Sequence, residues 1–133
     1  MAKMTQEIMD MVNAQDVIKM LGTVDEAKKI NVVPIASFAA LDAETLMYAD
    51  IFSGRTRKNL EKSKKATVTV YKPPMAGYQI KGTCTGFQSS GPLWEQVTQK
   101  IYQAMKVPCK GVGIIKVEEI YSVSPLSPGK AVV

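Results

Sequence analysis

The sequence predicts a mainly β protein of one domain, a small barrel of six antiparallel strands with short helices at its ends. Three observations lead to this fold class. Six short runs are rich in β-branched or alternating apolar residues, and turn-forming residues separate them. Gly82 and Gly86 lie inside the longest run, as glycines do where a sheet bends or bulges. The chain has 133 residues, enough for one core but with little room for a second.

The expected elements follow one another without a linker or an internal repeat. A helix is expected to begin near Thr5, because Ile8 and Val12 then share one apolar stripe. Another helix is expected from Pro92, which suits the first helical position, to Pro108, which stops it. The six strands are predicted at residues 17–24, 30–38, 45–50, 66–71, 78–88 and 112–123, and the segments DEAKK (25–29) and LDAE (41–44) have the composition of turns.

Composition excludes several classes of site. The chain contains no histidine, which removes Ser-His and Cys-His nucleophile pairs and histidine acid–base chemistry. Its two cysteines, Cys84 and Cys109, cannot supply the four ligands of a structural zinc ion. No catalytic triad, dyad or metal cluster is recognisable.

No segment is expected to enter a membrane. Acidic residues interrupt the N-terminal stretch, where a signal peptide needs an unbroken apolar core. The longest charge-free apolar run, residues 30–41, contains Pro34 and is shorter than the ~20 residues of a membrane-spanning helix. The sequence therefore predicts a cytoplasmic protein whose cysteines stay reduced.

A block of positive charge occupies residues 54–65. It holds six basic residues and one acidic residue, a net charge of +5 that equals the formal net charge of the whole chain. Ser53 is a candidate N-cap for a helix over about 54–63. The first backbone N–H groups of this helix, with the side chain of Arg55 and the hydroxyls of Ser53 and Thr56, would suit a phosphate group.

Composition alone leaves other interpretations of this block open. A solvated basic helix would have the same residues, with Leu60 on the core and Asn59 on the same face as Arg55. Binding to nucleic acid usually needs charge spread over a face with aromatic residues between the charges, and Phe52 is the one aromatic here. A membrane surface needs a long amphipathic helix. A small-phosphate site leads the functional interpretations but is not decisively ahead of plain solvation.

Four short motifs then point to a family. In chain order they are VVPI (32–35), YADIFSGRTRKNL (48–60), GYQIKG (77–82) and IYSVSP (120–125). In this order and at these intervals the chain resembles the FMN-binding split-barrel proteins, the relatives of pyridoxamine 5'-phosphate oxidase. The resemblance covers about residues 17–125. It implies a six-stranded antiparallel split barrel that forms a homodimer, with FMN in each of two clefts at the subunit interface.

The resemblance also implies which residues bind the cofactor. The second strand would run along the isoalloxazine ring, and the end of the third would approach the ring and the ribityl chain. The following loop and helix would hold the phosphate, and the fifth strand would border the ring through Gln79, beside Lys81. The cofactor-binding residues implied are Val32, Val33, Pro34, Ala49, Asp50, Ile51, Ser53, Arg55, Thr56, Asn59 and Gln79.

Other positions match the family less specifically. Trp94 or Tyr102 could cover the flavin from the second subunit, but their helical spacing with Val97 and Ile101 favours a role in the core. Tyr121 matches the family's C-terminal end, which often lies near the cleft. The authentic vitamin B6 oxidases hold substrate with a C-terminal arginine and histidine. That activity is not expected of this chain, which ends earlier and has no histidine.

The sequence therefore predicts an FMN-dependent oxidoreductase or electron-transfer flavoprotein, because a flavin brings its own redox chemistry. The expected partners are a second copy of the chain and a small molecule or a redox protein. The alternative is a split-barrel module that binds another cofactor, haem or a deazaflavin; haem is disfavoured because its usual histidine ligand is missing. A basic β-barrel that binds nucleic acid comes third.

Overall fold

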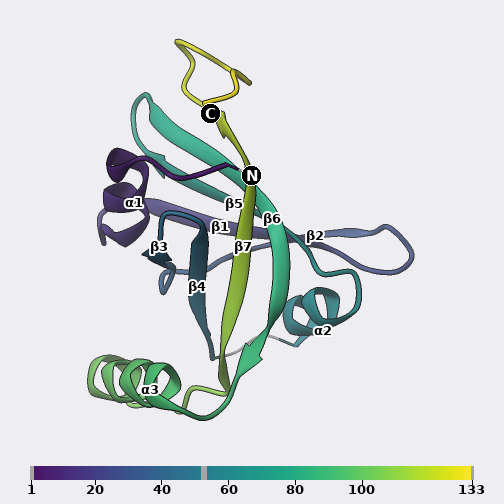
Figure 1. Ribbon diagram of the computed structural model, residues 1–133, viewed down its shortest axis with the longest axis vertical. Helices are drawn as coiled ribbons and strands as arrows, with labels where there is room; N and C mark the ends of the chain where they lie inside the picture. The colour runs from purple at the N-terminus through teal and green to yellow at the C-terminus, as the bar shows by residue number, and fades with distance from the viewer. Residues whose placement is uncertain (1, 52–53, 133) are drawn as a thin grey trace.

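Within the described part of the chain, seven strands form one antiparallel sheet, and three helices lie around it (Figure 1). The computed structural model describes residues 2–51 and 54–132. The order of the strands in the sheet is β2-β1-β5-β6-β7-β4-β3. The strands are β1 (Ile18–Val24), β2 (Ile30–Pro34), β3 (Ala39–Asp42), β4 (Thr45–Asp50), β5 (Lys65–Lys72), β6 (Ala76–Gln88) and β7 (Gly111–Ser122), and the helices are α1 (Gln6–Asn13), α2 (Arg55–Lys62) and α3 (Pro92–Met105).

The mainly β, antiparallel class is confirmed, but the expected number of strands is wrong by one. The segment expected as one strand over 30–38 ends at Pro34, and the separate strand β3 begins at Ala39. Between them the chain turns, and Lys19 Nζ donates to two backbone carbonyls of this turn at 3.3 and 3.4 Å. The first two residues of LDAE, expected as a turn, belong to β3, which pairs with β4.

The two longest strands, β6 and β7, bend where their pairing is irregular. The register shifts between Lys81 and Gly82, so that Glu118 is the extra residue on the β7 side. A Cβ at Gly82 would lie 2.1 Å from the Lys116 carbonyl oxygen, which explains the glycine at this close approach. Gly86 has a φ of +146° at the second shift, a backbone conformation that L side chains rarely adopt. Both interior glycines therefore mark bends, as the sequence predicts.

The sheet curls without closing. Its edges are β2 and β3, and within the described residues these two edges do not pair with each other. The turn after β2 connects the two edge strands. In this turn the Ser37 hydroxyl accepts a hydrogen bond from the Ala49 N–H of β4 at 2.9 Å. The architecture is thus a curved open sheet whose free edge, β2, lies near the end of β4.

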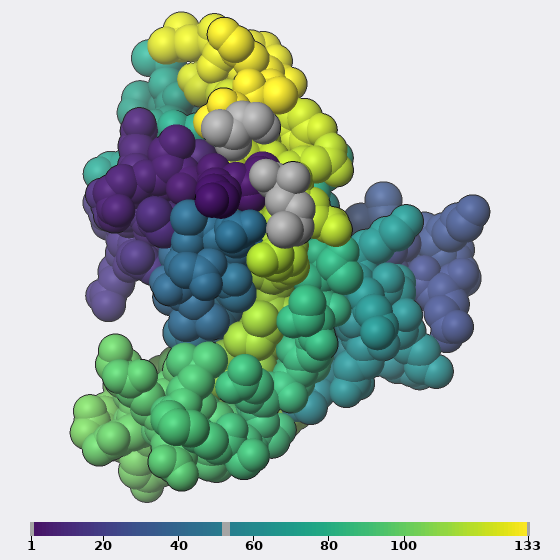
Figure 2. Space-filling view, in the orientation of Figure 1, coloured from purple at the N-terminus to yellow at the C-terminus, as the bar shows by residue number. Residues whose placement is uncertain are grey.

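Two apolar clusters stabilise the fold. The larger fills the inside of the sheet beneath α1 and includes the fully buried Leu21, Tyr48 and Ile115. The smaller lies under α3 and centres on Val97 and Val112. The last turns of α3 project beyond the sheet, as the lobe at the lower left of Figure 2 shows. Among the described residues, no helix is long and apolar enough to cross a membrane.

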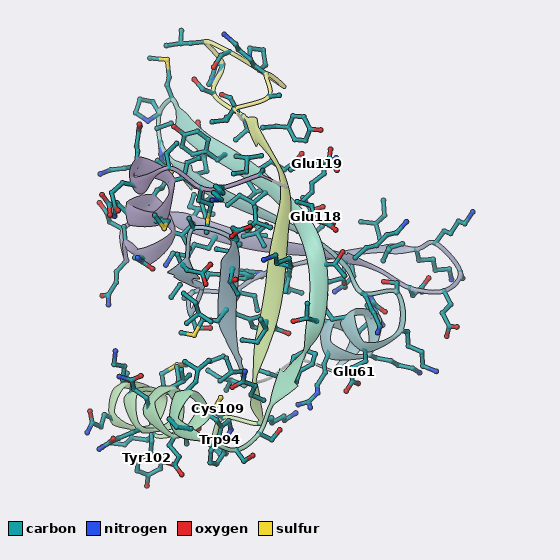
Figure 3. The ribbon with its side chains drawn as sticks, in the orientation of Figure 1. Glu61, Trp94, Tyr102, Cys109, Glu118 and Glu119 are labelled. Atoms are coloured by element: carbon teal, nitrogen blue, oxygen red, sulfur yellow. The ribbon has the colours of Figure 1, made fainter. Side chains whose placement is uncertain are left out.

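Of the two aromatic residues expected in the core from α3, the structure places only one there. Trp94 packs against the smaller cluster. Tyr102 is 56% exposed, so for this residue the expected core role is wrong. The neighbouring Ile101 packs against the smaller cluster, and the side chain of Tyr102 is turned about 100° further round the helix, where it is exposed. In Figure 3 the labelled side chains of Trp94 and Tyr102 both lie at the lower end of the molecule.

Candidate cofactor site

Helix α2 is fixed to β1 and β2 by buried polar side chains. Asn31 Nδ2, in β2, donates to Thr56 Oγ1 at 3.1 Å. Asn59 Nδ2, one turn further along α2, donates to Thr23 Oγ1 in β1 at 3.0 Å. Thr23, Thr56 and Asn59 are all buried, and Leu60 packs into the main core beside them. Because buried hydrogen bonds are costly to break, this side of α2 is held rigidly.

The other side of α2 is tied to the end of β4 by an ion pair. Arg57 Nη1 lies 2.9 Å from Asp50 Oδ2, and the Asp50 side chain is fully buried. The Arg57 guanidinium also stacks on Phe87, 4.5 Å from the ring centroid, and its Nε lies 3.5 Å from Glu61 Oε2. Figure 3 labels Glu61 on α2, beside β6. Burial alone would lower the pKa of Arg57, but the hydrogen bond and charge of Asp50, with Glu61, raise it above its ordinary value.

The beginning of α2 presents backbone donors next to an exposed arginine. Gly54 occupies the N-cap position, so no side chain caps the helix from there. The first intrahelical bond runs from the Lys58 N–H to the Gly54 carbonyl at 3.1 Å, and the preceding N–H groups of the first turn have no acceptor within the helix. Arg55 is exposed at this end. Backbone donors, the helix dipole and a guanidinium together form a site suited to a phosphate.

The expected N-cap, Ser53, lies outside the described residues, as does Phe52. The helix itself begins at Arg55, one residue later than expected, with Gly54 at the cap position. Glycine is an accepted N-cap residue, but it contributes no oxygen to the first turn. Within the described residues, the candidate phosphate site therefore consists of Arg55 and the backbone of the first turn.

The free edge of β2 lies beside this corner. The Ile35 N–H donates to the Lys19 carbonyl of β1 at 3.0 Å, so the backbone groups of every second residue of β2 point towards β1. By the same alternation, the N–H and C=O of Val32 point to the open edge. Pro34, which lacks an N–H, also falls on an outward position, where it disrupts no pairing. This edge can offer Val32 backbone groups to a flat, polar-rimmed ligand.

The same stretch of sheet has an exposed apolar face. On β1 and β2, Ile18, Ile30 and Val32 are 50%, 80% and 57% exposed. Their neighbours in the strands, such as Leu21 and Val33, point to the inside instead. Ile30 and Val32 pair with Val24 and Gly22 of β1, and Ile18 lies four residues from Gly22 on the same face. Large apolar side chains exposed on one face of a sheet are typical of an interaction face.

The structure brings most of the predicted site residues to one corner but exposes only some of their side chains. Val32 and Pro34 are exposed on β2, and Arg55 is exposed on α2. The remaining predicted side chains at this corner, other than the undescribed Ser53, are buried or half-buried: Val33, Ala49, Asp50, Ile51, Thr56 and Asn59. Of these, Asp50, Thr56 and Asn59 bond to other side chains and so build the corner.

Gln79 lies apart from this corner within one chain. It faces the outside of the sheet in a row that runs through Pro34, Met20, Thr69, Gln79 and Tyr121 on successive strands. Two strands, β1 and β5, lie between β6 and β2, so three interstrand spacings of about 4.8 Å separate Gln79 from β2. Lys81, two residues along, lies with its Nζ 5.5 Å from the centre of the Tyr121 ring. A role of Gln79 in the same site would need a second subunit.

Sequence reasoning missed the residues that hold the corner together. Asn31, Arg57 and Phe87 were not singled out, although Arg57 and Glu61 have the i,i+4 spacing of a helical ion pair. A polar Asn31 at an inward position of β2 was a second available signal. In the part of the chain that the structure describes, no group of His, Cys, Asp and Glu side chains is placed to hold a metal ion.

Comparison with known proteins identifies the family that this chain matches. Residues 4–124 match the family model described as pyridoxamine 5'-phosphate oxidase. The crystal structure of the tagged HupZ protein from Group A Streptococcus is 31% identical, with a TM-score of 0.83 over 98% of this chain and 99% of that one.

Two more distant solved structures share the fold. An FMN-binding protein from Syntrophomonas wolfei subsp. wolfei is 19% identical, with a TM-score of 0.81 over 87% of this chain and 83% of that one. HutZ, the haem storage protein of Vibrio cholerae, is 14% identical, with a TM-score of 0.68 over 93% and 98%. Identities this low show the fold alone.

Proposed function

Because this chain belongs to the pyridoxamine 5'-phosphate oxidase family of split-barrel proteins, we propose that it is a flavoprotein that binds FMN and transfers electrons or hydride. Bound FMN would supply the redox chemistry, and the chain would bind it, orient it and restrict its access to solvent. A cofactor that supplies the redox chemistry suits a chain without histidine and without a recognisable catalytic triad. An authentic vitamin B6 oxidase activity is not part of the proposal.

The observation that supports FMN most strongly is the start of α2. Its backbone donors and Arg55 lie beside the free edge of β2, because Asn31 of β2 bonds to Thr56 of α2 at 3.1 Å. A phosphate at the first turn and a ring along Val32 would thus be parts of one ligand. The fit rests on the chemistry of the donors: N–H groups and a guanidinium for the phosphate, and backbone amides for the ring rim.

We further propose that the working unit is a homodimer built on the exposed face of β1 and β2. Ile18, Ile30 and Val32 would be covered by a second copy, and the cofactor would lie between the two chains at the β2 edge. A second copy would also offer residues such as Gln79 to the ring. In an isolated chain, this face would leave three large aliphatic side chains in water.

The alternative cofactors are less well supported by this chain. Haem iron needs an axial ligand, and histidine is absent. Cys84 and Cys109 are 2% and 6% exposed, so neither thiol is presented on a surface. A deazaflavin would use the same ring and phosphate contacts, so only a direct comparison of the two binding affinities distinguishes it from FMN. Nucleic acid is disfavoured, because Arg57 of the basic block is already paired with Asp50 and Glu61.

The proposal is tested by titrating the cofactor-free protein with FMN, a deazaflavin and haemin while recording absorption spectra. We expect saturable binding of one FMN per chain, a shifted flavin spectrum and reduction of the bound flavin by dithionite. Tighter binding of the deazaflavin or of haemin would assign the site to that cofactor. Binding of none of the three would end the proposal.

A further inference from the structure

We infer that Arg57 is the positioning residue of the phosphate corner, acting through its contacts with Asp50 and Phe87 rather than by touching the ligand. The inference rests on the proposed function and adds a residue that is not among the cofactor-binding residues implied by the family resemblance. It assigns different roles to two arginines that are two positions apart in one helix.

The geometry separates Arg57 from the ligand side of the helix. A two-residue step along an α-helix turns a side chain by about 200°, so Arg55 and Arg57 lie on nearly opposite faces. Arg55 is exposed beside the first turn, whereas Arg57 points to the end of β4 and to β6. The guanidinium of Arg57 is occupied by Asp50 at 2.9 Å, by Glu61 at 3.5 Å and by the Phe87 ring.

These contacts join three elements at the point where the chain leaves β4 and enters α2. Asp50 is the last residue of β4 and is fully buried, so its carboxylate cannot follow a moving helix. Phe87 is part of β6 and makes an edge-to-face contact with Tyr48 at 6.1 Å, which fixes the ring under Arg57. The Lys110 N–H donates to the Asp50 carbonyl at 2.7 Å and fixes the backbone of the strand end.

The consequence for binding follows from the position of Arg57 in the first turn of α2. The backbone N–H groups of this turn are the proposed phosphate donors, so an anchor inside the turn sets where they point. Asn31 and Thr23 hold the opposite side of the helix. With Arg57 removed, the helix would remain attached on one side but its first turn could tilt, and preorganisation of the donors would be lost.

A ligand pair distinguishes this role from a general effect on folding. FMN and riboflavin differ only in the phosphate, so the ratio of their dissociation constants reports on the phosphate corner alone. We would measure both constants by flavin fluorescence for the full-length wild type, Arg57→Met, Arg57→Lys and Phe87→Leu. Lys62→Met is the matched control, because it removes one positive charge from the exposed far end of the same helix.

We expect Arg57→Met to lower the FMN preference about 10-fold or more, with the riboflavin constant changed less than about threefold. Arg57→Lys and Phe87→Leu should lower the FMN preference by intermediate factors, and Lys62→Met should leave the FMN preference unchanged. If Arg57→Met does not fold, the other two variants decide. The inference would be overturned if the folded variants keep the FMN preference within about twofold of the wild-type value. It would also be overturned if they lose affinity for FMN and riboflavin equally. A wild type that binds neither flavin would instead refute the proposed function.

Discussion

Single residues of the basic block differ in what they do, although the sequence presents them as one run of charge. Arg55 is exposed at the start of α2, Arg57 is paired with Asp50, and Lys62 lies 3.9 Å from Glu26 at the far end of the helix. Only Arg55 combines a free guanidinium position with the backbone donors of the first turn. The block is therefore divided between one exposed arginine, the proposed phosphate contact, and residues that make ion pairs within the fold.

Arg55→Ala should weaken FMN binding by about 10-fold or more, because a charge-assisted contact to the phosphate is lost. The Arg55 side chain is exposed, so the free energy of unfolding should stay within about 0.5 kcal/mol of wild type. Isothermal titration calorimetry with FMN, and urea denaturation for stability, check both statements. Equal weakening by Lys62→Ala would reassign the effect to general surface charge.

Lys19 gives a prediction about pH. It is buried, and desolvation lowers its pKa below the ordinary value of 10.5. Between the folded pKa and 10.5 the unfolded chain binds more protons than the folded one, so this residue makes the free energy of unfolding rise with pH. Relative to Lys19→Met, the wild type should therefore gain stability as pH approaches 10.5. Urea denaturation of both proteins from pH 7 to 10 measures this, and a constant difference would contradict it.

At this scale the sequence predicted which residues of α2 lie at the corner, and their binding of a phosphate stays a prediction. Arg55, Thr56 and Asn59 were expected as ligands of the phosphate, and all three lie on α2 at the predicted corner. Thr56 and Asn59 are buried because their side of α2 meets β1 and β2. Their hydrogen-bond partners in these strands lie 25 and 36 residues away in the chain. Local pattern carries no information about such partners.

Among the elements, those with strong local signals agree with prediction. β4 spans 45–50 as expected, and α3 begins at Pro92. The error at β2 and β3 has a physical cause: residues 30–38 form one apolar run, and the break comes from a turn held by Lys19, a tertiary contact.

The bend of β6 against β7 can be tested at Gly82. Gly82→Ala would place a Cβ 2.1 Å from the Lys116 carbonyl oxygen, so the strands must separate at the bulge. We expect a loss of about 3 kcal/mol in the free energy of unfolding, measured by urea denaturation. The control is Gly54→Ala, where a Cβ meets nothing within 4 Å, with an expected cost of about 1 kcal/mol or less. Equal costs would show that close approach does not explain this glycine.

For the whole molecule, the central feature of the account is the proposed cofactor site at the open edge of the sheet. The family predicted from four motifs is confirmed by the match over residues 4–124. What the sequence could not indicate is the exposed face of β1 and β2, because the alternation of apolar residues in these strands is the same for a core and for an interface. The homodimer stays a prediction of this account.

Val32→Lys should separate the subunits, because it places a charge in the middle of the proposed interface, on a residue 57% exposed in the single chain. FMN affinity should fall together with dimerisation, since the cofactor would lie between the chains. Size-exclusion chromatography with light scattering measures the mass, and Leu41→Lys, on the opposite edge strand β3, is the control. A monomeric wild type that binds FMN fully would contradict the dimer.

The most direct test of the central claim is a crystal structure of the wild-type protein with FMN. The account predicts the phosphate within hydrogen-bonding distance of the backbone N–H groups of the first turn of α2 and of the Arg55 guanidinium, with the ring along Val32. A phosphate bound elsewhere, with Arg55 directed into solvent, would contradict it.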